Sequence, residues 1–177
     1  MSALTSVVDR PDLASVALEG GDVLPYLHAV CTQHTLDLVP GDTTQALLLS
    51  PKGKIEFAFR LAVLDGGALL DTEAAAAPAL AERLARFVFR YDVAVGQPVA
   101  GAATVLGPGA GDAVAGLAGA DTYPDRAGAG GTASTSPGPA SVGPGLVVHR
   151  TPVGFDLVGP AAPAAADGLV SAGAERA

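Results

Sequence analysis

The sequence predicts an α+β fold in which helices cover antiparallel sheets. The strongest single observation is the run from Lys54 to Leu64, in which apolar residues alternate with polar or small ones as in a half-buried strand. A second is the helical spacing of apolar residues over 80–88, where charged residues occupy the opposite face. The third is the order of expected elements, which reads β-α-β-β-β-α-β and then a weaker β-α-β-β-α.

The first expected elements are a short strand and a helix. Val16 and Leu18 alternate with small or polar neighbours, and a glycine pair follows them. Asp22 is placed to act as the N-cap of a helix that we expect to end near Gln33 or His34.

A three-stranded meander is expected next. Turn residues at 51–53 and 65–67 flank the alternating run, and apolar stretches at 45–49 and 68–70 lie beyond the two turns. The periodic segment 80–88 then predicts a helix that lies across this sheet, and a strand is expected at 93–95.

The second half of the chain has a weaker pattern. We expect a strand at 104–106, a helix near 112–117, a hairpin of 146–150 with 155–158, and a closing helix over 160–177. Residues 127–145 are rich in Gly, Pro, Ser and Ala, a composition that buries little surface and predicts a flexible loop. We therefore divide the chain into residues 1–100 and 101–177.

Composition limits the classes of partner. Hydrophobic residues make up 49% of 177 residues, which is enough for a core. A net charge of -8 disfavours nucleic acid as a broad-surface partner. No apolar stretch approaches the roughly 20 residues that cross a bilayer. Cys31 is the single cysteine, and the first residues are too polar for a signal peptide, so we expect a cytoplasmic protein without disulfides.

Two motifs invite a functional interpretation but have simpler explanations. His28, Cys31 and His34 could ligate a metal, yet on one helix they spread over a wide arc and lack a fourth ligand, so a core cysteine with histidines at the helix edge is favoured. The glycines of 107–111 could cradle a phosphate, but Pro108 removes one N–H donor and a flexible turn explains the pattern. No metal site and no catalytic residue is predicted.

The turn at 51–54 is the most informative position, because Lys52 and Lys54 are the only lysines of an acidic chain. Two cations on one turn could hold an anionic ligand group. Alternatively, they are solvated charges that protect a hairpin from edge pairing, and charge alone favours this second interpretation.

Taken together, several segments resemble the front part of the YgfZ family of folate-binding proteins. The resemblance covers residues 8–97 well and the remainder loosely. It rests on Leu18-Glu19-Gly20-Gly21-Asp22, Tyr26-Leu27, Cys31-Thr32-Gln33, Gly41, the run Ala46 to Ile55 with its Pro-Lys-Gly-Lys turn, Leu69-Leu70-Asp71, and Leu84 to Val93. The family's K-G-C-[YF]-x-G-Q-E motif and its C-terminal barrel are not in this chain, and neither is the tryptophan that some relatives place near Leu13.

The resemblance implies an aminomethyltransferase-type folate-binding fold of two packed α/β plaits. It also implies tetrahydrofolate as the ligand and an accessory role, without ordinary catalysis, in iron-sulfur cluster maintenance and tRNA modification. Iron-sulfur proteins would then be partners. Lys52 and Lys54 would face the glutamate tail of the folate, and Phe57 and Phe59 would line the pocket.

Two alternatives stay open. One is a folate-dependent one-carbon transferase, although the related aminomethyltransferase has a catalytic aspartate where this chain reads Ile55-Glu56-Phe57-Ala58-Phe59. The other is an incomplete, non-catalytic interaction module. The oligomeric state is not set by the sequence.

Overall fold

The computed structural model describes residues 5–117, 140–141, 146–151 and 153–177. The chain divides into two compact units. We call Pro11–Ala100 the first unit, and Met1–Arg10 together with Gly101–Ala177 the second unit. Each has its own hydrophobic core, and each is described by itself below.

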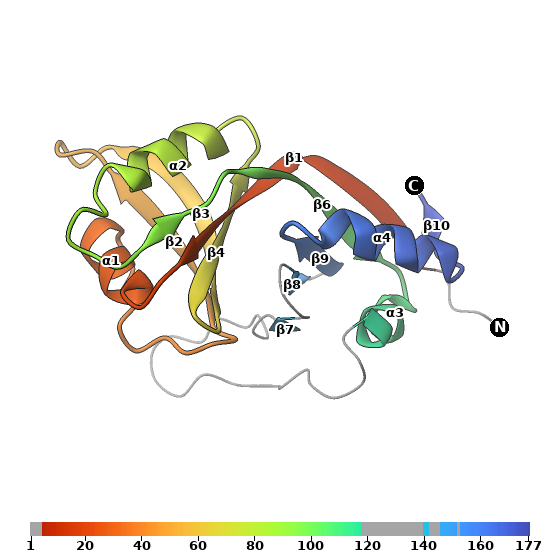
Figure 1. The fold of residues 1–177 in the computed structure, drawn as a ribbon. Helices are drawn as coiled ribbons and strands as arrows, with labels where there is room; N and C mark the ends of the chain where they lie inside the picture. Colours follow the sequence, from red (N-terminus) through yellow and green to blue (C-terminus); the bar gives the residue numbers. More distant parts are fainter. Residues whose placement is uncertain (1–4, 118–139, 142–145, 152) are drawn as a thin grey trace. The chain divides into compact units, whose positions relative to one another are not determined.

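The first unit is built on an antiparallel sheet in the order β2-β3-β4-β1 (Figure 1). The expected meander of three strands is confirmed as β2, β3 and β4, joined by the two predicted turns. The short β5 pairs with the end of β1, where Leu18 lies opposite Val95. The strands are β1 (Ser6–Glu19), β2 (Thr43–Leu49), β3 (Ile55–Leu64), β4 (Gly67–Glu73) and β5 (Ala94–Val95).

Two helices, α1 (Val23–Val30) and α2 (Ala77–Ala85), cover one face of this sheet. Alternate residues of the strands meet the apolar faces of both helices in one core, as the periodicity predicts. Its largest fully buried side chains are Leu18, Tyr26, Leu27, Leu48, Leu61, Leu70, Leu80 and Leu84.

The second unit has the same architecture from smaller residues. Its sheet has the order β6-β9-β8-β7, and α3 and α4 pack on one face of it. The core contains mainly valine and alanine, with Leu157 as its largest fully buried member. The elements are β6 (Val99–Leu106), α3 (Ala110–Leu117), β7 (Ala140–Ser141), β8 (Val147–Thr151), β9 (Gly154–Val158), α4 (Ala162–Ser171) and β10 (Glu175–Arg176), the last paired in parallel with the start of β1.

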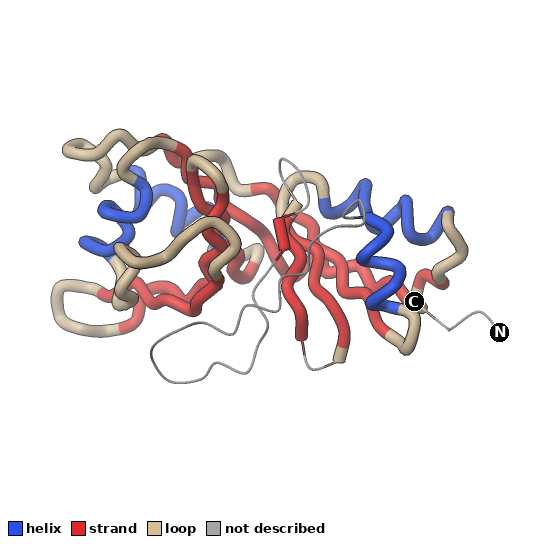
Figure 2. The backbone as a smooth tube through the Cα atoms, turned by 90° about the horizontal axis from the view of Figure 1, so that it is seen from below, coloured by secondary structure: helices blue, strands red, loops and turns tan. Residues whose placement is uncertain are grey.

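The two units therefore repeat one topology. Each runs strand, helix, three strands, helix, and in each the first strand of the series lies next to the last. No repeat is visible in the sequence at a fixed period, so the duplication becomes apparent only from the strand order. Strands dominate both units (Figure 2), and the predicted α+β class holds in a sheet-dominated form.

Several predicted boundaries were wrong. Strand β1 covers 14 residues instead of a short segment around Val16. Helix α1 ends at Val30, because Cys31 is extended and forms a bridge with Leu48. Helix α2 ends at Ala85 rather than 88.

The closing helix is also shorter than predicted. Gly173 adopts a φ of 109°, which favours glycine, and its N–H donates to Val170 O while the Ala174 N–H donates to Leu169 O. This pair of bonds is a Schellman motif, which ends α4 and turns the chain into β10. The flexible loop predicted at 127–145 lies outside the described residues except for 140 and 141, which form β7.

A close contact between two loops fixes the start of α1. Asp22 occupies the N-cap as predicted, but its carboxylate accepts a hydrogen bond from the Asp92 N–H at 2.9 Å instead of from the helix. In return, the Asp92 carboxylate accepts from the Gly21 N–H at 3.2 Å. Gly20 passes so near Asp92 that a Cβ there would lie 2.1 Å from its carbonyl oxygen.

The exposed edge of β2 is partly capped. The Thr32 N–H donates to Leu47 O at 2.9 Å, and the Thr32 hydroxyl accepts from the Leu47 N–H at 3.1 Å. These bonds satisfy edge groups that would otherwise be open to pairing with another strand. Among the described helices, none has the length and apolarity that a membrane crossing requires.

Candidate functional site

The helix-free face of the first unit carries a row of polar side chains. Asp71 on β4 lies opposite Ser15 on β1 and Arg60 on β3, and Gln45 on β2 lies opposite Arg60. Because side chains alternate along a strand, these four residues point to one face, away from the core residues Leu61 and Leu70. The register thus gathers polar groups from four strands.

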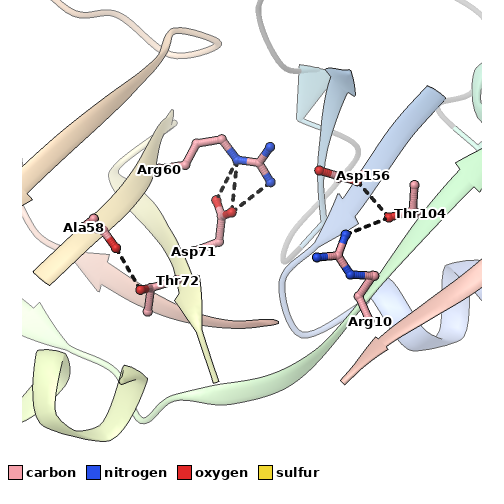
Figure 3. Close-up of polar contacts among 7 residues, drawn as sticks. All are labelled: Arg10, Ala58, Arg60, Asp71, Thr72, Thr104 and Asp156. Atoms are coloured by element: carbon pink, nitrogen blue, oxygen red, sulfur yellow. Dashed lines mark hydrogen bonds and ion pairs between the residues drawn. The ribbon is translucent and has the colours of Figure 1, made fainter. Parts of the chain in front are cut away.

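The centre of this row is a two-pronged ion pair (Figure 3). Arg60 Nη2 lies 2.8 Å from Asp71 Oδ2, and Arg60 Nε donates to the same carboxylate at 3.0 and 3.2 Å. Asp71 is only 6% exposed. A planar guanidinium that holds a carboxylate in this way fixes the orientation of both groups.

Ser15 lies beside this pair and is 2% exposed. Its Oγ has no hydrogen-bond partner within the described residues. A buried hydroxyl without a partner is unfavourable by about 1–3 kcal/mol, so a polar ligand atom that reached it would gain a bond without displacing one. Thr43 Oγ1, which shares this face on β2, is also buried and without a partner among those residues.

The second unit has a corresponding row on its own helix-free face. Asp156 on β9 lies opposite Thr104 on β6 and His149 on β8. The Thr104 hydroxyl donates to Asp156 Oδ1 at 2.9 Å and accepts from Arg10 Nη1 at 3.4 Å (Figure 3). Thr104, His149 and Asp156 are all buried.

The repeated strand order makes the two rows equivalent. Strands β4 and β9 each supply an aspartate, β1 and β6 each supply a hydroxyl, and β3 and β8 each supply a basic residue. A buried carboxylate held in position by its neighbours is suited to accept paired N–H donors from a planar heterocycle. The arrangement therefore favours binding and orientation of a polar ring.

The residues predicted from the sequence lie elsewhere on the first unit. Lys52 and Lys54 are exposed on the turn between β2 and β3. Phe59 is 4% exposed and belongs to the core beneath the helices, and Phe57 is half-buried against that core. The structure does not bring the two phenylalanines and the two lysines onto one surface, and their roles toward folate stay predictions.

Sequence reasoning missed Asp71, Arg60 and Ser15 as a group. Asp71 was visible at the end of an apolar strand and Arg60 within the alternating run, but their pairing depends on strand register. That register follows from the turn at 65–67, which the sequence did indicate.

The other motifs show local contacts. The His28 and His34 rings meet edge to face with centroids 4.7 Å apart, and His34 Nε2 lies 3.2 Å from Asp37 Oδ2. Burial raises the pKa of the Cys31 thiol, which lies 3.9 Å from Gln33 O. Within the described residues, no three His, Cys, Asp or Glu side chains are grouped as a metal site would need.

The glycine motif at 107–111 forms a turn. Gly107 belongs to the turn into α3, where its carbonyl accepts a hydrogen bond from the Ala110 N–H.

A cavity of about 450 Å³ lies within the second unit, between α3 and α4. Its lining is formed mainly by small residues, with Thr5 and Asp112 as the polar members. Asp112 is exposed and Thr5 is half-buried, so neither of the polar residues in the described lining is a fully buried group that would orient a ligand.

No protein-family model matches the sequence, and no curated protein is significantly similar to it. Among solved structures, the fold is similar to the glycine cleavage system aminomethyltransferase T from Bartonella henselae, with a TM-score of 0.75 and 19% sequence identity. The match covers 98% of this chain and 48% of that enzyme, so the chain spans about half of its length. The chain therefore has a fold similar to that of part of an aminomethyltransferase T.

Proposed function

We propose that this chain is a tetrahydrofolate-binding accessory protein of the YgfZ type, with its two units as the two plaits of the aminomethyltransferase-type fold. The similarity to the fold of an aminomethyltransferase T supports a folate-related fold. The observation that carries the proposal is the oriented Asp71 carboxylate beside the unpartnered Ser15 hydroxyl on a helix-free sheet face.

The chemistry of a pterin ring suits this row. Its amino group and the adjacent ring N–H are parallel donors, and a carboxylate accepts such a pair with both oxygens. The Arg60 guanidinium already occupies part of Asp71, so the ring would share the carboxylate or displace Arg60 from it. The Ser15 hydroxyl would bond a further polar atom of the ring.

Lys52 and Lys54 remain the candidates for the glutamate tail in this proposal. Lys54 precedes Arg60 by six residues, which along a strand amounts to about 20 Å. Folate is elongated, with its anionic tail far from the pterin ring, so a pterin at the row would direct the tail along β3 toward the turn.

The test is calorimetric titration of reduced tetrahydrofolate into the full chain. We expect Ser15→Ala to keep or raise the unfolding temperature, because the hydroxyl that it removes has no partner among the described residues. The same change should weaken binding about three- to tenfold, because the ligand loses one hydrogen bond. Asp71→Asn removes the ion pair as well, so its fold has to be checked by circular dichroism. The double variant Lys52→Ala, Lys54→Ala is expected to weaken binding through the tail.

Asp65→Asn is the matched control, because Asp65 is exposed on the turn between β3 and β4. It should leave the affinity unchanged. Absence of binding to the native chain would refute the proposal, and so would an affinity that neither Ser15→Ala nor a folded Asp71→Asn variant changes.

Roles in iron-sulfur cluster maintenance and tRNA modification rest on the YgfZ resemblance alone and are part of the proposal. The alternative of one-carbon transfer is less favoured, because residues 55–59 contain no aspartate and β3 directs Phe57 and Phe59 into the core. Formation of a methylene-tetrahydrofolate product by the purified chain would revive that alternative.

A further inference from the structure

The segment that follows α2 presents two aromatic rings to solvent. Phe89 is 80% exposed and Phe87 is 40% exposed. Arginines accompany both rings: the Arg83 guanidinium lies 4.3 Å from the centre of the Phe87 ring, and that of Arg90 lies 6.0 Å from the centre of the Phe89 ring. With Arg86, these residues form what we call the Phe-Arg surface.

This surface is anchored from below. Val88, between the two phenylalanines, and Tyr91, which follows them, pack against the core of the first unit. The Phe87 N–H donates to Leu84 O at 3.0 Å, and the Tyr91 N–H donates to Val88 O at 2.8 Å. Because Val88 and Tyr91 anchor the segment to the core, its backbone keeps Phe87 and Phe89 at the surface.

A bulge in β3 supports the same surface. The register with β2 shifts between Leu48 and Leu49, so that Glu56 is an extra residue between the paired Ile55 and Phe57. Its carboxylate reaches α2, where Arg83 Nε donates to Glu56 Oε2 at 2.9 Å. Arg83 is thus fixed from one side by Glu56 while its planar group covers Phe87, a geometry in which cation and ring stabilise each other.

Aromatic and arginine side chains are the residues most enriched at the centres of protein interfaces. Single exposed apolar residues are common on protein surfaces. Here two neighbouring rings are exposed on an anchored backbone, so they form an apolar area that a partner could cover. Phe89 is 80% exposed even with the Arg90 guanidinium over its ring.

Charge identifies the kind of partner. Arg83 and Arg86 have carboxylate partners in Glu56 and Glu82, whereas no carboxylate contacts Arg90 in the described part of the chain. A partner that complements this surface would bring an acidic group for Arg90 and an apolar group for Phe89. A nucleic acid, with one charge per about 1.7 Å of duplex, is repelled by a chain of net charge -8 more strongly than a peptide with a few carboxylates.

We propose that the Phe-Arg surface docks an acidic segment of another protein in which carboxylates alternate with large apolar side chains. An apolar side chain packs on Phe89 and Phe87, and a neighbouring carboxylate pairs with Arg90. This docking function is separate from the polar rows and does not require folate.

The experiment uses the full chain and a fluorescein-labelled ten-residue peptide of alternating Glu and Leu, followed by fluorescence anisotropy. We expect saturable binding that weakens as salt is raised, and at least tenfold weaker binding to the Phe89→Ser, Arg90→Gln double variant. Both side chains are exposed, so the variant should retain the native circular dichroism spectrum. A peptide with Gln in place of Glu should bind much more weakly.

Val153→Ser is the matched control, because Val153 is 72% exposed in the second unit and its loss should leave peptide binding unchanged. The proposal is overturned if the acidic peptide does not bind, if the double variant binds it as well as the native chain does, or if a twelve-nucleotide single-stranded RNA binds this surface more tightly than the peptide.

Discussion

Tyr26 shows how one buried side chain makes the stability of this fold depend on pH. Its hydroxyl donates to Leu84 O at 2.7 Å, which links α1 to the last turn of α2, and its ring meets that of Tyr91 edge to face. Burial, which disfavours the phenolate, raises the pKa of Tyr26 to about 12.

We predict that the free energy of unfolding falls as the pH rises from about 10 to about 12. In that window the unfolded chain loses the Tyr26 proton while the folded chain retains it, so alkali favours unfolding, by up to about 2–3 kcal/mol. Urea denaturation at a series of pH values measures this. In Tyr26→Phe the decrease over this window should be smaller by that amount, and the variant should lose about 1 kcal/mol at neutral pH because its hydrogen bond to Leu84 O is removed. An equal decrease in the variant would contradict the assignment to Tyr26.

At the scale of elements, the contact between the β1–α1 turn and the loop before β5 is tightly constrained. Gly20 has a φ of 135° and no room for a Cβ, and reciprocal hydrogen bonds join the Asp22 and Asp92 segments. A change here has to move backbone, because the obstructing atom is a carbonyl oxygen.

We predict that Gly20→Ala lowers the free energy of unfolding by about 2–4 kcal/mol, combining an overpacked contact with an unfavourable φ. Thermal and denaturant unfolding of the purified variant would measure the loss. Gly41→Ala is the control, since Gly41 also has a positive φ, 96°, but nothing lies within 4 Å of its added Cβ. A loss in Gly20→Ala no larger than that in Gly41→Ala would show that steric contact with Asp92 is unimportant.

The sequence predicted elements well where one strong pattern was present. Strand β3 was found because its alternation is nearly perfect, and its turns set the meander. The length of β1 was missed because Asp9, Arg10, Pro11 and Asp12 interrupt its alternation. Helix α2 was extended too far because Phe87 and Val88 continue the apolar spacing, although the Phe87 N–H bonds three residues back.

The polar row was harder to predict than the elements, because it depends on contacts between strands. Ser15 and Arg60 are 45 positions apart and meet only through Asp71. The sequence indicated cations at the turn instead, since Lys52 and Lys54 stand out by residue type.

At the scale of the whole molecule, the two units rely on separate cores of different quality. Leucines and aromatic rings fill the first, whereas alanine and valine make up most of the second. Apolar burial scales with side-chain size, so the second unit is expected to open at a lower free energy.

We predict that Leu157→Ala, a change in the core of the second unit, selectively reduces hydrogen-exchange protection in β8, β9 and α4. The loss should be about 2–5 kcal/mol. Protection in β3 and β4 should change much less. Leu61→Ala, at an equally buried position of the first unit, is the reciprocal control. Uniform loss of protection in both units from either variant would mean that the chain unfolds as one cooperative block.

The repeated strand order has an evolutionary consequence. Two modules with one connectivity, each with an aspartate, a hydroxyl and a basic residue at matching strand positions, are the pattern left by duplication and fusion of a shorter gene. After such an event, backbone connectivity persists longer than side-chain identity, which accounts for a symmetry that the letters of the sequence conceal. Arg60 and His149 hold matching positions in the two modules, with a guanidinium in one and an imidazole in the other.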